Sequence, residues 1–222
     1  MKMNKKKKQY VVIGLDSFGR SVASTLESNG CMVLAIDKDQ KKVNQISDYV
    51  TSARCLDVKD EDAVKELGLK NFDAAIFSLA NSLETAVLAT ICMKDEGIPY
   101  IIAEAYDKEQ GRVLEKVGVD RVIYSEQEMG VHLANNLAFN HLVDAVELSS
   151  DYTIAEIKLP PSWEGKNLIQ LNLRKKYDVN VIALKRNDQI DITPIADMPL
   201  QKTDVLVLIG KNDIIKRLSN LL

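Results

Sequence analysis

The stretch that most constrains the fold of this chain lies at its start. A β-branched run, Tyr10–Ile13, is followed by Gly14, and an amphipathic helical pattern begins at Ser17. A second apolar run, Met32–Ile36, ends directly on Asp37. The runs are typical of buried parallel strands, and the order strand, glycine turn, helix, strand and acid is that of a dinucleotide-binding βαβ unit. The stretch therefore predicts a Rossmann-like sheet.

Each part of such a unit has a physical task. Gly14 makes the tight turn, the helix N-terminus offers unpaired N–H groups to an anion, and Asp37 accepts hydrogen bonds from a ribose. Asp37 lies 18 residues after Gly19, close to the usual spacing of about 20. However, Asp16 replaces the middle glycine of the G-x-G-x-x-G pattern. Because any parallel α/β fold can turn with glycine here, a structural turn and a nucleotide site both stay open at this point.

Strand and helix patterns continue to alternate until about residue 124, giving six βα repeats. This number predicts a doubly wound parallel sheet with helices on both faces. Ligands of such sheets bind at the carboxyl ends of the strands. The residues expected at those ends are Gly14, Asp37, Asp57, Ser78, Leu79, Ala80, Asn81 and Glu104.

The pattern changes in the last third of the chain. A helix is expected from Glu126 to about Val143, and period-two alternation then starts at Tyr152. The later pattern predicts strands over 152–159, 179–185, 189–193 and 205–209, with helices over 172–177 and 211–222. The expected organisation is a basic tail at 1–8, a Rossmann-like domain with a crossover helix at 9–146, and a smaller α+β domain at 149–222.

Composition and motifs limit the classes of function that the chain can have. The formal net charge of −3 provides no broad basic field, which argues against a nucleic-acid partner. The chain has no run of 18 apolar residues that would span a bilayer. It also lacks G-x-S-x-G, H-E-x-x-H and P-loop motifs, and the C-terminal domain contains no histidine. These features predict a binding protein with no catalytic residues.

Several longer motifs resemble a known family. Val12–Gly19, Ala35–Asp37, Leu114–Ile123 and Glu126–Gly130 resemble the RCK nucleotide-binding (TrkA-N) domain of the regulatory subunits of Ktr/Trk potassium-uptake systems, in particular the Ktr type. In the tail, the motifs that resemble the RCK C-terminal (TrkA-C) domain are Ser162–Gly165, Leu171–Arg174 and Tyr177–Lys185. The resemblance covers essentially the whole chain after residue 8.

This resemblance implies a non-enzymatic cytoplasmic subunit at the inner face of the membrane. Members assemble as homodimers into a ring, with an octamer as one candidate size, beneath a separate integral-membrane potassium channel subunit. They gate that channel according to the ligand that they bind.

The resemblance also implies the site residues. In the first domain, an adenine nucleotide (ATP, ADP or NAD(H)) would contact the turn at Asp16, Ser17 and Phe18 and the family positions Gly14, Gly19, Asp37 and Asp57. Glu126 matches a carboxylate that accompanies a divalent cation, Mg²⁺ or Ca²⁺, near the phosphates. The positions expected to bind cyclic di-AMP at a dimer two-fold axis in the second domain are Leu168, Leu173, Arg174, Asn180, Val181 and Pro194.

Three residues depart from the family pattern. Asp16 replaces a glycine, Ser17 replaces an arginine, and Glu104 stands where members often carry a lysine. Asp16 is a natural N-cap, so its carboxylate is expected to bond the N–H groups near Phe18 and Gly19 that a phosphate would otherwise use. We therefore expect weak or absent binding of ATP and ADP, unless a divalent ion on Glu126 compensates. Two alternatives stay open: a stand-alone cyclic-dinucleotide receptor whose first site is degenerate, and a small NAD(P)-dependent oxidoreductase.

Overall fold

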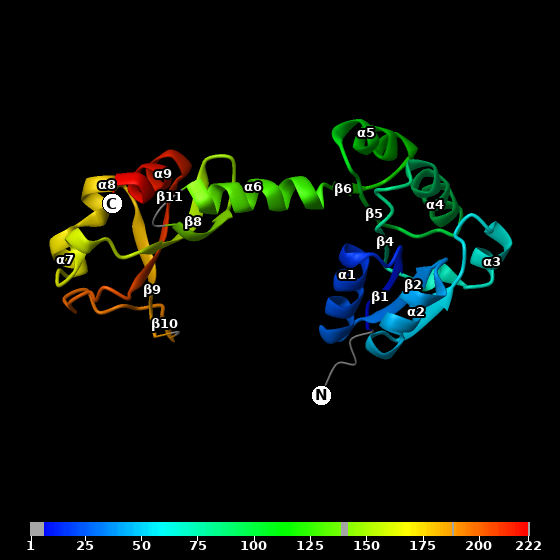
Figure 1. Cartoon of the computed structure of the whole chain (residues 1–222), viewed down its shortest axis with the longest axis horizontal. Coiled ribbons are helices and arrows are strands. Elements are labelled where there is room, and N and C mark those ends of the chain that lie inside the picture. Colours follow the sequence, from blue (N-terminus) through cyan, green and yellow to red (C-terminus); the bar gives the residue numbers. More distant parts are fainter. Residues whose placement is uncertain (1–6, 139–141, 188, 222) are drawn as a thin grey trace. The chain divides into compact units, whose positions relative to one another are not determined.

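The chain forms two compact units, Met1–Glu128 and Met129–Leu222, which Figure 1 shows with their elements labelled. The structure is a computed structural model, and it describes residues 7–138, 142–187 and 189–221. Most of the predicted basic tail, residues 1–6, lies outside these ranges. Within them, no helix combines the length and the hydropathy needed to cross a membrane.

The first unit contains a six-stranded parallel sheet with the strand order β3-β2-β1-β4-β5-β6. This order confirms the Rossmann-like prediction, because the chain winds outward from β1 in both directions. The strands are β1 (Gln9–Ile13), β2 (Met32–Asp37), β3 (Ser52–Cys55), β4 (Ala74–Phe77), β5 (Ile101–Glu104) and β6 (Arg121–Ile123).

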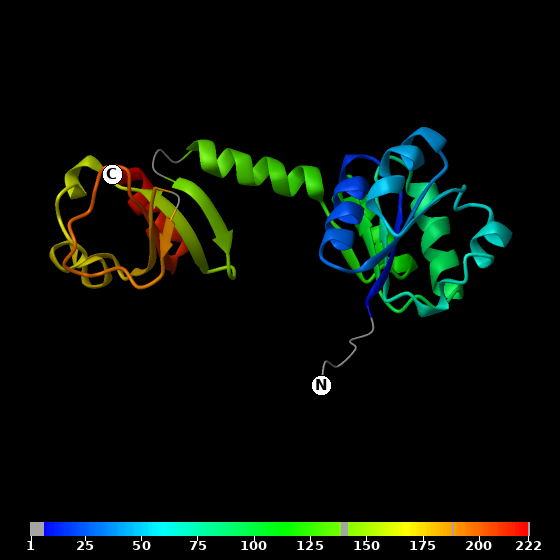
Figure 2. The same ribbon diagram turned by 90° about the horizontal axis from the view of Figure 1, so that it is seen from below.

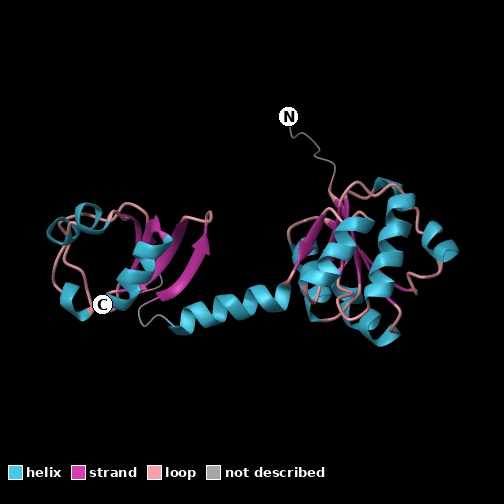
Figure 3. Ribbon diagram, turned by 90° about the horizontal axis from the view of Figure 1, so that it is seen from above, coloured by secondary structure: helices cyan, strands magenta, loops and turns pink. Residues whose placement is uncertain are grey.

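Helices cover both faces of this sheet (Figure 3). They are α1 (Ser17–Ser28), α2 (Gln40–Ile46), α3 (Glu61–Lys65), α4 (Leu83–Asp95) and α5 (Lys108–Val117). The next helix, α6 (Ser125–Ala138), follows β6 and contains the boundary between the two units. The first five begin with a side chain that accepts a hydrogen bond from a first-turn N–H group, which satisfies a donor that the helix itself leaves unpaired. These caps are Asp16, Asp39, Asp60, Ser82 and Asp107.

Strand β1 is buried on both faces, as its β-branched run predicts. Val11 and Ile13 belong to an apolar cluster that also contains Phe77, whereas Val12 belongs to a second cluster with Ala35. Because side chains alternate along a strand, the two clusters occupy opposite faces of the sheet. This packing fixes the end of β1, and with it the position of the glycine turn that follows.

The second unit contains a five-stranded antiparallel sheet with the order β10-β9-β11-β8-β7. Its strands are β7 (Leu142–Glu147), β8 (Tyr152–Lys158), β9 (Asn180–Arg186), β10 (Gln189–Asp191) and β11 (Val205–Lys211). After β7, the described residues also form the helices α7 (Leu168–Leu171), α8 (Leu173–Tyr177) and α9 (Asn212–Leu221), and the core of the unit contains Trp163 and Leu208. This is the smaller α+β module that the sequence predicts.

One prediction at the junction is wrong. The helix expected to reach Val143 ends at Ala138, and Leu142–Glu147 forms β7, which pairs with β8 (Figure 2). The apolar residues of this segment do not alternate with a period of two, and pairing along β8 decides for the strand. The strand therefore belongs to the second sheet and not to the domain of residues 9–146.

Candidate functional site

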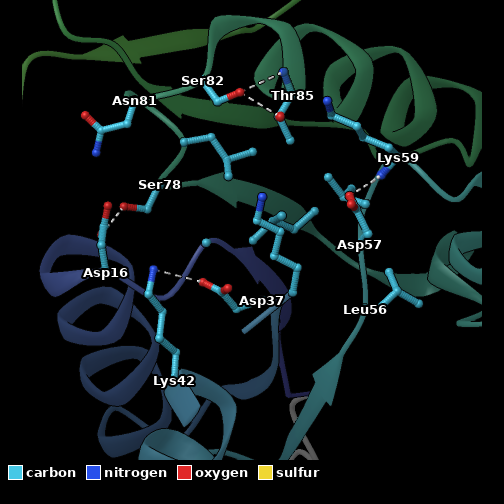
Figure 4. A pocket seen from close by; sticks show the side chains of 15 residues that line it. Asp16, Asp37, Lys42, Leu56, Asp57, Lys59, Ser78, Asn81, Ser82 and Thr85 are labelled. Atoms are coloured by element: carbon cyan, nitrogen blue, oxygen red, sulfur yellow. Dashed lines mark hydrogen bonds and ion pairs between the residues drawn. The ribbon is translucent and has the colours of Figure 1, made fainter. Parts of the chain in front are cut away.

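A pocket of about 290 Å³ lies at the carboxyl ends of β1, β2, β3 and β4 (Figure 4). It is therefore located where parallel α/β sheets bind their ligands. Its fifteen lining residues are Ile13, Gly14, Asp16, Asp37, Lys38, Lys42, Leu56, Asp57, Val58, Lys59, Ser78, Leu79, Asn81, Ser82 and Thr85.

The Asp37 carboxylate is fixed at the end of β2 by the surrounding backbone. Its Oδ2 accepts a hydrogen bond from the Leu15 N–H at 2.7 Å, and its Oδ1 accepts one from the Asp39 N–H at 2.8 Å. The Lys42 ammonium forms an ion pair with Oδ2 at 3.5 Å, and the Asp37 side chain is only 8% exposed. Each carboxylate oxygen has two acceptor sites, so Oδ1 keeps one site for a ribose hydroxyl.

Two glycines allow the turn to pack tightly. Gly14 has a φ of +90°, and a Cβ built on it would lie 2.1 Å from the Ser78 carbonyl oxygen. A Cβ on Gly19 would lie 1.9 Å from the Gly14 carbonyl oxygen. Both distances are far below van der Waals contact, so only glycine fits at either position. The first turn of α1 consequently lies directly against the ends of β1 and β4.

Asp16 caps α1 as the sequence predicts. Its Oδ1 accepts a hydrogen bond from the Gly19 N–H at 3.1 Å and another from the Ser78 hydroxyl. A carboxylate thus occupies one of the N–H donors that a phosphate uses at the start of a Rossmann helix. Ser17, the next residue, is exposed and adds no positive charge.

Glu104 lies behind this turn, at the end of β5, and its side chain is 7% exposed. Its Oε2 lies 3.0 Å from the Ser78 hydroxyl, and its Oε1 accepts a hydrogen bond from the hydroxyl of Ser125, the first residue of α6. Four side chains therefore lie in one row with each within hydrogen-bonding distance of the next, Asp16–Ser78–Glu104–Ser125. We call this row the acidic row.

The rest of the pocket combines apolar walls with lysines. Leu56, Val58 and Leu79 supply apolar surface suited to a planar base, and Lys38, Lys42 and Lys59 add positive charge. The Lys59 ammonium donates a hydrogen bond to Glu84 Oε1 at 2.7 Å, and this bond raises the pKa of Lys59.

The structure brings together only part of the predicted nucleotide site. Gly14, Asp16, Asp37, Asp57 and Leu79 line the pocket, whereas Ser17, Phe18, Gly19, Ala80 and Glu104 do not. The sequence reasoning missed the three lysines and the walls at Leu56 and Val58. Two signals were available, because Lys38 directly follows the acid and Lys42 lies in the first turn of the helix that comes next.

Glu126 is exposed in the first turn of α6. Among the residues that the structure describes, no three histidine, cysteine, aspartate or glutamate side chains are arranged to hold a metal ion. The divalent-cation role of Glu126 therefore stays a prediction.

The residues predicted to bind cyclic di-AMP have different environments in the second unit. Arg174 and Asn180 are exposed, and Leu168, Val181 and Pro194 are half-buried. Leu173 is only 3% exposed and packs in the core of the unit. Within this chain, therefore, Leu173 supports the fold and does not offer an open contact surface.

Comparisons with known proteins agree with this architecture. A model of the TrkA-N domain matches residues 10–125, and a model of the TrkA-C domain matches residues 153–222. The Ktr system potassium uptake protein A of Bacillus subtilis (strain 168) is 34% identical over 215 residues, which are 97% of this chain and 97% of that protein. Protein C of the same system and strain is 33% identical over 204 residues, 92% of each chain.

A solved structure shares the fold. The crystal structure of the GsuK RCK domain superposes with a TM-score of 0.67 at 16% identity. The match covers 98% of this chain and 48% of the GsuK chain, so the present chain spans about half the length of the GsuK chain. From the two domain matches and the two relatives we conclude that the chain belongs to the family of TrkA-N and TrkA-C domain proteins that includes the Ktr system potassium uptake proteins.

Proposed function

We propose that this protein is a non-enzymatic regulatory subunit of a potassium-uptake system. It acts at the cytoplasmic face of the membrane, where homodimers build a ring that gates a separate integral-membrane potassium channel subunit. Support comes from relatives named as Ktr potassium uptake proteins, which match this chain over more than nine-tenths of its length. Coexpression with such a channel subunit, in cells that lack other potassium uptake, should restore growth at low potassium. A chain that leaves uptake unchanged would contradict this role.

The first unit is proposed to bind the adenosine part of an adenine nucleotide. The observation that carries this proposal is Asp37, a fixed carboxylate at the end of β2 that lines a pocket with apolar walls. Thermal shift measurements with ATP, ADP, NAD, NADH and cyclic di-AMP would identify the ligand class, because ligands that bind the folded state raise the melting temperature. If the melting temperature rises with none of the four adenine nucleotides and not with adenosine either, the first unit does not contain this site.

Replacing Asp37 with alanine should weaken binding of the adenine ligand by about 1.5–3 kcal/mol, the range for a hydrogen bond to a charged group. Titration calorimetry measures this loss. Since Asp37 also accepts from Leu15 and Asp39, the melting temperature of the unliganded variant must be compared with that of the parent. An Asp37→Asn variant, which keeps one acceptor oxygen, should lose less affinity. Equal affinity of the parent and the alanine variant would remove Asp37 from the site.

The second unit is proposed to bind cyclic di-AMP across a dimer axis. The favouring observation is that Arg174 on α8 and Asn180 at the start of β9 are both exposed. A guanidinium can pair with a phosphate through two parallel hydrogen bonds, which a lysine cannot reproduce.

Arg174→Lys should therefore weaken cyclic di-AMP binding about tenfold while the dimer persists, since one bidentate contact is lost and the charge stays. Calorimetry gives the affinity and light scattering the mass. Lys175→Arg, a swap at the neighbouring exposed position, is the matched control and should leave the affinity unchanged. If Arg174→Lys binds as tightly as the parent, Arg174 does not contact the ligand.

The two alternatives predict different results. A stand-alone cyclic-dinucleotide receptor would bind cyclic di-AMP but leave potassium uptake unchanged in the coexpression experiment. An NAD(P)-dependent oxidoreductase would bind NAD or NADH and turn over a substrate, which absorbance at the nicotinamide band would report.

A further inference from the structure

We propose that the pocket of the first unit selects an adenine nucleoside with a free 5′-hydroxyl over its 5′-phosphorylated forms. The inference rests on the proposed adenine site and goes further by naming the chemical class of the ligand. The acidic row Asp16–Ser78–Glu104–Ser125 determines this specificity.

The acidic row has more acceptors than protons at its pocket end. The Ser78 hydroxyl lies within hydrogen-bonding distance of both Asp16 Oδ1 and Glu104 Oε2. One hydroxyl carries one proton, so it can donate to only one of these two carboxylates at a time. Asp16 also uses Oδ1 for the Gly19 N–H, and no described residue bonds its Oδ2. At this end of the pocket, the described residues therefore supply fewer hydrogen-bond donors than the two carboxylates can accept.

A free 5′-hydroxyl supplies the missing donor. In Rossmann-like sites the ribose bonds the acid after the second strand, and its 5′ side faces the glycine turn. With the ribose at Asp37, the 5′ group therefore reaches Asp16, which lines the same pocket (Figure 4). A hydroxyl there donates to a carboxylate, whereas an ionised phosphate has no proton to donate and places a like charge beside Asp16.

The three lysines of the pocket form no ion pair with the acidic row in the described part of the chain. Lys42 forms its ion pair with Asp37, Lys59 forms its own with Glu84, and Lys38 is exposed to solvent. Within the described part of the chain, no lysine or arginine forms an ion pair with Asp16 or Glu104. Glu104 is also held in place by the Ser125 hydroxyl, which donates a hydrogen bond to its Oε1. A 5′-phosphate would thus meet fixed negative charge.

Titration calorimetry of the full chain with adenosine, AMP, ADP and ATP, in a chelator that removes divalent ions, tests the inference. Adenosine should bind at least about tenfold more tightly than ATP, with AMP and ADP in between, because affinity should fall as 5′ charge rises. Asp16→Asn and Glu104→Gln each remove one charge at nearly constant shape, and each should reduce the ratio of adenosine to ATP affinity at least about threefold. Asp95→Asn, which removes a charge at the far end of α4, should leave the ratio unchanged.

The outcomes separate this inference from the proposed function. If the parent binds ATP as tightly as adenosine, or more tightly, the specificity is wrong and the adenine site stands. If Asp95→Asn reduces the ratio as much as the two variants of the acidic row, the selection reflects overall charge and the role of the row is wrong. If none of the four ligands binds, both the specificity and the adenine site are wrong.

Discussion

The double variant Asp16→Gly with Ser17→Arg is expected to bind ATP at least about a hundredfold more tightly than the parent protein. In the parent, the Asp16 carboxylate occupies the Gly19 N–H at the start of α1. A phosphate at that position would meet a like charge, and one such pair at about 4 Å costs roughly 4 kcal/mol at an effective dielectric constant near 20, less with solvent screening. Glycine leaves the Gly19 N–H free to bond a phosphate, and the new arginine adds a positive charge that attracts the phosphate.

The two single variants show how much of the gain in ATP affinity comes from each substitution. Asp16→Gly should supply most of it, and it should keep α1 intact because glycine replaces an N-cap carboxylate at a cost of only a few tenths of a kcal/mol. Ser17→Arg alone should gain less, since Asp16 still holds the Gly19 N–H. Calorimetry without divalent ions measures each affinity. ATP binding at micromolar concentration by the unmodified protein would show that Asp16 does not block the phosphate position.

Gly19→Ala is expected to destabilise the first unit by about 3 kcal/mol or more, at the upper end of what overpacking costs. The new Cβ would lie 1.9 Å from the Gly14 carbonyl oxygen and 3.0 Å from the Ser78 Cβ. Backbone atoms cannot rotate away, so α1 would have to move off the end of β1. The shift would also open the pocket, so affinity for adenine ligands should fall in the same variant.

Gly130→Ala is the matched control, because a Cβ on this helical glycine of α6 meets no atom within 4 Å. It should raise stability by roughly 0.5–1 kcal/mol, since alanine favours the helix. Urea unfolding followed by circular dichroism compares the two variants. Similar stabilities of Gly19→Ala and the parent would mean that α1 does not pack against Gly14 as described.

The sequence predicts the βαβ unit well because local signals define it. A β-branched strand, a glycine turn and a strand ending on Asp37 are each visible within about ten residues, and the N-cap role of Asp16 follows from its side chain and its position. The structure confirms the parallel sheet and the cap. Positions that depend on a few neighbouring residues were therefore predictable.

The parts that depend on distant contacts were not predictable in this way. Ser78 lies 62 residues from Asp16 and 26 from Glu104, and only the strand order places them together. The start of β7, Leu142 and Val143, was predicted as the end of a helix, and pairing with β8, a tertiary contact, makes it a strand instead. Likewise, the burial of Leu173 depends on the core that forms around it and not on its local sequence.

Hydrogen–deuterium exchange of the full chain tests most directly whether the pocket of the first unit is the adenine site. The protein would be compared alone and with a saturating concentration of whichever of adenosine, AMP, ADP and ATP binds most tightly. Slower exchange is expected in peptides that cover the pocket segments 14–19, 37–42, 56–59 and 78–85. Asp37→Ala should lose this protection at the same ligand concentration. Protection confined to residues 168–194 of the second unit, with none in the four pocket segments, would show that the adenine ligand binds elsewhere.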